Sequence, residues 1–174
     1  MKTKSVACAA VLLLAIPAGL AFAGGAGGVG WGMQYYDPEY SSADAGFTYI
    51  TGYGYGTTWG GSRMGGFGMA MISIDGMGAG GVGGMILGHE WSGGPLMAAL
   101  TLWAGVGGGG YQKGGYMIGF GEADFELGVR LTPWMQITAY AGYQAWGNLI
   151  PGYPFSRALL YTPVVGVRIG WGAY

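Results

Sequence analysis

Charged residues are scarce in this chain of 174 residues: aspartate, glutamate, lysine and arginine make up only 9% of it. No stretch gathers enough lysine or arginine to follow a phosphate backbone, so we expect no nucleic-acid partner. A soluble protein with so little charge would be difficult to keep dispersed in water. The 51% of hydrophobic residues also argues against disorder, in spite of 41 glycines. The composition therefore indicates a folded protein that is poorly suited to remain dispersed in water.

Cysteine and histidine are almost absent too, which leaves little for metal or nucleophilic chemistry. Cys8 and His89 are the only residues of their kinds. A zinc site of the His-Glu-x-x-His type needs a second histidine and a helix. A hydrolase site could be imagined from His89, Glu90 and Ser92, but alternation along a strand sends His89 and Ser92 to opposite faces. We predict no catalytic residue, no metal site and no cofactor.

The chain begins with the pattern of a secretory signal peptide. Two lysines precede an apolar stretch from Val6 to Leu20, and an Ala-x-Ala site follows at 21–23. We predict that residues 1–23 are removed and that residues 24–174 form a single domain. That domain would contain no cysteine, so packing and hydrogen bonds alone would hold it.

The sequence also lacks the periodicity of helices and shows that of β-strands instead. Glycine recurs every few positions, and each one would cost a helix about 1 kcal/mol relative to alanine. What recurs instead is alternation with a period of two, which is typical of β-strands. Eight segments show it: 28–36, 46–58, 63–74, 80–91, 96–106, 116–131, 134–146 and 162–174. The fold class is therefore all-β.

Many of these segments set large residues on one face and glycine on the other. We expect the small faces to line the lumen of a barrel, at Gly28, Gly30, Gly52, Gly54, Gly66, Gly68 and Gly170. Because a barrel of eight strands is only wide enough to be filled by side chains, Phe120, Tyr140 and the charged residues of the lumen would have to fill it.

An open sheet with so much apolar surface would aggregate through its edges, whereas a closed barrel has no edge and can face lipid. We therefore predict an antiparallel up-and-down transmembrane β-barrel of about eight strands. Thr132-Pro133 fits a very short turn. Short connections near 58–62, 92–95 and 132–133 would lie at one end, and the connections at 37–45, 75–79, 107–115 and 147–161 at the other.

One group of polar residues is predicted to meet inside the barrel, because charges on spanning strands are costly on the lipid face. Its members are Glu122, Asp124, Glu126, Arg130, Arg168, Gln136 and Gln144. The group would be either an ion-paired plug that fixes strand register, or a proton or ion path or polar ligand site.

Three further features concern the ends of the barrel. The runs 76–81 and 105–110 match the glycine pattern of dinucleotide-binding loops, but neither opens a helix, so we interpret them as turns or outer loops. Tyr153 and Phe155 are candidates for a contact outside the cell, with an unknown surface partner. Near the predicted strand ends, an interfacial girdle would be formed by Trp31, Trp59, Trp91, Trp134 and Trp171.

The signal peptide, the alternating segments, the hairpin at 127–134 and the terminal Tyr174 resemble small outer-membrane β-barrel proteins of the OmpA/OmpX type. The resemblance implies the bacterial outer membrane as location, with outer-membrane lipid and the barrel-assembly machinery as partners. One departure is that Tyr174 is in phase with Gly172 and Arg168 rather than with the apolar residues of the last segment.

Three functions stay open at this point. The first is a non-enzymatic outer-membrane barrel that supports the envelope or presents loops to a partner. The second is an exported soluble or surface-assembled glycine-rich β protein, whose small faces let sheets stack. The third is an outer-membrane lipid-modifying enzyme, which would need His89 and an acidic partner to converge.

Overall fold

Each of the eight alternating segments forms one β-strand. The computed structural model describes residues 24–34, 47–58, 60–73, 78–111, 114–149 and 159–173. The strands are β1 (Gly25–Gln34), β2 (Phe47–Thr57), β3 (Ser62–Ser73), β4 (Gly78–Gly93), β5 (Leu96–Tyr111), β6 (Gly114–Thr132), β7 (Met135–Asn148) and β8 (Leu159–Gly172). The predicted signal peptide at 1–23 lies outside the described residues, and so do Trp59 and Tyr174.

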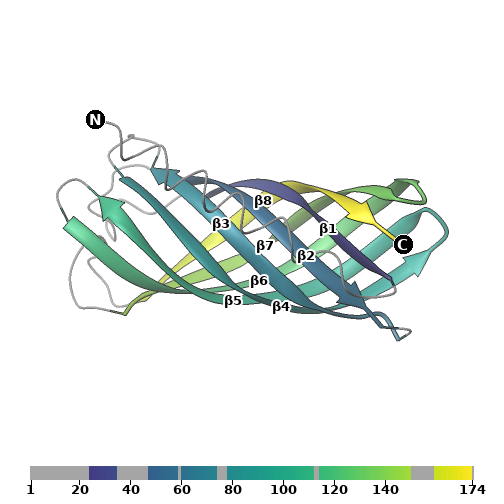
Figure 1. The fold of residues 1–174 in the computed structure, drawn as a ribbon, viewed down its shortest axis with the longest axis horizontal. Helices are drawn as coiled ribbons and strands as arrows, with labels where there is room; N and C mark the ends of the chain where they lie inside the picture. The colour runs from purple at the N-terminus through teal and green to yellow at the C-terminus, as the bar shows by residue number, and fades with distance from the viewer. Residues whose placement is uncertain are drawn as a thin grey trace.

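The strands form a closed antiparallel barrel in which every strand pairs with its neighbours in the chain, and β1 pairs with β8. At Val29 the closure is visible in the register, since this residue lies opposite Gly52 on one side and Ile169 on the other. The strands run obliquely around a common axis (Figure 1). The prediction of a closed up-and-down barrel of eight strands is confirmed.

The two ends of the barrel differ in their connections. At the turn end, short links at 58–61, 94–95 and 133–134 join the strands. Positive φ angles at Gly61 and Gly94, 83° and 61°, suit these tight turns. At the opposite end, which we call the loop end, β1 joins β2, β3 joins β4, β5 joins β6 and β7 joins β8.

The prediction that the connection covers 107–115 is wrong, because most of these residues belong to strands. β5 continues to Tyr111 and β6 begins at Gly114. The glycine runs are likewise strand rather than turn where they are described: 78–81 lies in β4, 105–110 lies in β5, and the two runs pair with each other. In a closed barrel both edges of every strand are hydrogen-bonded, which outweighs the low β-propensity of glycine.

The assignment of faces is wrong for β2 and β3. Gly52, Gly54, Gly66 and Gly68 share the outer face with Val29, as the register shows. The large residues of these strands point inward and are buried, namely Tyr49, Tyr53, Tyr55, Phe67, Met69 and Met71. Because an eight-stranded barrel must fill its lumen with side chains, the small residues that line β1 require large residues on the strands around them.

Inward glycines make room for these large side chains. The hydroxyl group of Tyr140 lies where Cβ atoms on Gly32 and Gly166 would stand, and the Tyr53 hydroxyl lies 2.8 Å from a Cβ built on Gly28. Phe120 and Tyr140 are buried in the lumen, as the sequence indicated. Side chains of the lumen therefore pack directly against these inward glycines.

Candidate functional site: the lumen ion-pair network

The centre of the site is a row of three carboxylates on β6. Glu122, Asp124 and Glu126 are two residues apart, so all three side chains point into the lumen. Each is 5% exposed or less. Three anions so close together would repel one another in a buried setting, so the fold must place cations against them.

Arg168 of β8 supplies the cation for all three carboxylates. Its Nη2 donates to Glu122 at 2.9 Å and to Asp124 at 2.8 Å, while its Nη1 donates to Glu126. The guanidinium carbon also lies 3.7 Å from the ring centre of Tyr140 and 4.4 Å from that of Trp103. Charge-assisted hydrogen bonds and two cation–π contacts thus hold one arginine from every side.

A second arginine, Arg63 of β3, was missed in the sequence analysis. Its guanidinium donates to Glu126 at 2.9 Å and to Glu90 at 2.6 Å, and Arg130 donates to the other oxygen of Glu90 at 2.6 Å. Arg63 also lies 4.4 Å from the ring centre of Tyr55. Glu126 therefore joins Arg63 to Arg168, and Glu90 joins Arg63 to Arg130.

Amide and hydroxyl groups occupy the remaining sides of the network. Gln144 donates to Glu122 and, at 3.2 Å, to the hydroxyl of Tyr49. Thr101 donates to Glu126 at 2.8 Å. Gln136 donates at 3.3 Å to the hydroxyl of Tyr55, which lies under Arg63. The structure thus brings all seven predicted residues into one connected group, which Arg63 and Glu90 complete.

The network contains three cations and four anions among the described residues. Among the described residues the cations are Arg63, Arg130 and Arg168, the anions are Glu90, Glu122, Asp124 and Glu126, and all of them belong to it. Its ion pairs link β3 to β4 and β6, and β6 to β8, across strands that are not all neighbours. Removing one member of such a buried pair costs about 3–5 kcal/mol, because its partner stays buried. The arrangement can therefore lock the strands together across the lumen.

The imagined hydrolase residues do not converge. His89 lies on the outer face and contacts the ring of Trp91, with 4.8 Å between ring centres. Glu90 points the opposite way and is paired with Arg63 and Arg130. Ser92 lies opposite Met97, which is buried on the lumen side. Nor do the described residues include a group of three or more histidine, cysteine or acidic side chains that could hold a metal ion.

A groove of about 810 Å³ crosses the outer face over β5 to β8, and its lining includes Ala98, Leu127, Ala139 and Val167. These four residues follow one another in register. The candidate contact residues Tyr153 and Phe155 lie outside the described residues.

In the part of the chain that the structure describes, no helix is long and apolar enough to cross a membrane. Comparisons with protein-family models, with curated proteins and with solved structures gave no significant match to this chain.

Proposed function

We propose that this protein is a transmembrane β-barrel of the bacterial outer membrane, closed by an ion-paired plug. Its role is to support the envelope or to present the connections of its loop end to a partner. Its partners are outer-membrane lipid and, during assembly, the barrel-assembly machinery, as in proteins of the OmpA/OmpX type.

The observation that carries this proposal is the distribution of charge over the two faces of the wall. All charged side chains of the described residues point into the lumen, while the outer face carries exposed apolar side chains on all eight strands. Leu127, for example, is 57% exposed, next to Glu126 at 4%. Such a surface suits hydrocarbon, where a charge would be costly.

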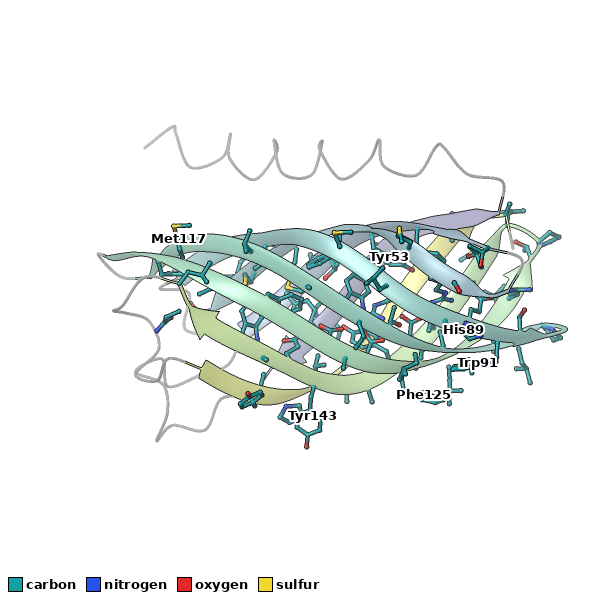
Figure 2. All side chains as sticks on the ribbon, turned by 90° about the horizontal axis from the view of Figure 1, so that it is seen from below. Tyr53, His89, Trp91, Met117, Phe125 and Tyr143 are labelled. Atoms are coloured by element: carbon teal, nitrogen blue, oxygen red, sulfur yellow. The ribbon has the colours of Figure 1, made fainter. Side chains whose placement is uncertain are left out.

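Exposed aromatic residues near the two ends of the barrel also support a membrane around its outer face. Trp91, Trp134 and Trp171 lie near the turn end, and Trp31 and Tyr161 lie nearer the loop end. Figure 2 shows Trp91, Phe125 and Tyr143 pointing away from the barrel. Tryptophan and tyrosine favour the two interfaces of a bilayer, so these rings would mark its boundaries.

The plug supports a barrel without an open pore. The charged network fills the lumen on the side of the turn end, and Phe67, Phe120 and Trp146 fill it further towards the loop end. So many side chains buried in the described part of the lumen argue against a continuous water path of the kind found in large porins.

Fractionation with a gel assay tests the proposal. We expect the expressed protein in the outer membrane, soluble only with detergent, with a gel mobility that changes on boiling because a closed barrel resists detergent when cold. Recovery in the soluble periplasm or the medium would overturn the membrane assignment and favour a stacking glycine-rich protein. In planar bilayers the purified barrel should give no steady conductance, and an open-channel current would contradict the plug.

A further inference from the structure

In one segment of the barrel wall, no side chain lies directly opposite another side chain on either neighbouring strand. We call Gly105–Tyr111 the loop half of β5. Every register pair with β4 from Gly78↔Tyr111 to Gly84↔Gly105 contains at least one glycine. The same holds for every pair with β6 from Gly105↔Phe120 to Tyr111↔Gly114.

The other half of β5 is different. There, side chains face one another directly in pairs such as Leu87↔Leu102 and Leu100↔Phe125. Opposed pairs are the unit that stabilises a sheet beyond its backbone hydrogen bonds. The loop half of β5 thus depends mainly on backbone hydrogen bonds, and its glycines gain more freedom than other residues on release.

A second feature at the same place is a buried hydroxyl group without a partner. Tyr116 of β6 is 8% exposed, and no described residue makes a hydrogen bond to its hydroxyl group. That group lies over the glycine pair Gly80↔Gly109, 2.7 Å from a Cβ built on Gly109. A buried polar group left unpaired lacks the hydrogen bonds that it would make in water, and exposure to water restores them.

We propose that the loop half of β5 opens locally from β4 and β6 while the rest of the barrel stays closed, and that the Tyr116 hydroxyl favours the open state. The ring of Phe67, whose end lies 3.0 Å from a Cβ built on Gly105, would then become accessible through the opened wall. Because unpaired backbone groups are costly in hydrocarbon, the opening requires that water reaches the segment from the loop end, where β5 ends at Tyr111.

Hydrogen exchange of the purified, folded full chain in detergent tests the opening. After correction for intrinsic rates, we expect the amides of 105–111 to exchange at least about tenfold faster than those of 97–103. Equal protection in the two halves of β5 would overturn the proposal.

The Tyr116→Phe variant tests the hydroxyl group, because it keeps the ring and removes the unpaired oxygen. We expect exchange of 105–111 to slow by at least about fivefold, with no change at 97–103. Tyr140→Phe is the matched control, since the Tyr140 hydroxyl is hydrogen-bonded to Tyr49 at 2.9 Å and its loss should not protect 105–111. An unchanged rate in Tyr116→Phe would overturn the part assigned to the hydroxyl.

A reversible lock provides a measurement that does not depend on Tyr116. Gly83 and Val106 are directly opposed on the outer face, and a Cβ on Gly83 would make only an ordinary contact at 3.6 Å, so the double variant Gly83→Cys and Val106→Cys can form a disulfide between β4 and β5. Oxidation should slow exchange of 105–111 and reduction should restore it. If exchange is as fast in the oxidised form as in the reduced form, the segment does not open from β4.

Discussion

Gly32 and Gly68 are both glycines of the barrel wall, but Gly32 faces the lumen and Gly68 faces outward, and their surroundings differ completely. A Cβ on Gly32 would collide with the hydroxyl groups of Tyr49 and Tyr140, whereas a Cβ on Gly68 would meet nothing within 4 Å. The lumen glycine is therefore required by the side chains packed against it. Nothing in the fold requires the outer glycine, so glycine content alone does not tell which face is packed.

Charge separates the two faces in the same way. Inward positions hold a network in which each arginine has defined partners, while outward positions carry exposed apolar side chains of different shapes. The charged side chains of the lumen thus depend on specific partners, whereas the side chains of the outer face need only be apolar. Substitutions on the two faces should differ in size, and for Gly32 and Gly68 they should differ in sign.

Arg168→Met should produce the largest effect, because it leaves the buried Glu122 and Asp124 without a cation and Glu126 with Arg63 alone. We expect the free energy of unfolding to fall by about 3–5 kcal/mol, measured by urea titration of the folded barrel in detergent or lipid. The adjacent Val167→Met on the outer face is the control and should change it little. A loss below 1 kcal/mol for Arg168→Met would show that the network does not hold the strands together.

Leu127→Arg tests the outer face directly. If this face lies in hydrocarbon, an arginine at position 127, five residues inside the turn end of β6, should cost about 2–4 kcal/mol in lipid bilayers, and Leu131→Arg beside that end only about 0–1 kcal/mol. The comparison of the two variants by unfolding titration in bilayers separates depth from general damage. Equal losses at both positions would argue against a membrane around the barrel.

Gly32→Ala should be smaller but clearly unfavourable. The added methyl group must displace the Tyr49 and Tyr140 hydroxyls, which are held by each other and, at Tyr49, by Gln144. Overpacking of this kind costs about 1–3 kcal/mol, and the same titration measures it. The double variant Gly32→Ala with Tyr140→Phe should recover part of the loss. No recovery would mean that the strain lies elsewhere.

Much of the architecture could be predicted from the sequence, because alternation reports strands wherever side chains differ between two faces. The segment 116–131 shows this best: its carboxylates share one phase and Phe125 and Leu127 share the other, and β6 has this arrangement. The boundaries of β5 could not be predicted, because glycine runs have no alternation. Residues 105–110 form a strand because they pair with β4 on one side and with β6 on the other.

The lumen face of β2 and β3 could not be predicted from size, because tyrosine, phenylalanine and methionine suit either face of a membrane barrel. A usable signal was nevertheless present. Arg63 is in phase with Phe67, and a charge inside a spanning strand marks the lumen side. The same argument would have added Glu90 to the predicted group, since it shares its phase with Ile86.

Gly68→Ala completes the comparison with the smallest effect and the opposite sign. The new methyl group meets open space, and alanine loses less conformational freedom on folding than glycine. We expect the free energy of unfolding to rise by about 0.5–1 kcal/mol in the titration that gives a loss for Gly32→Ala. The two variants carry the same chemical change, so a gain at Gly68 beside a loss at Gly32 assigns the difference to the face. A loss at Gly68 similar to that at Gly32 would show that a partner outside the barrel wall also packs closely against this glycine.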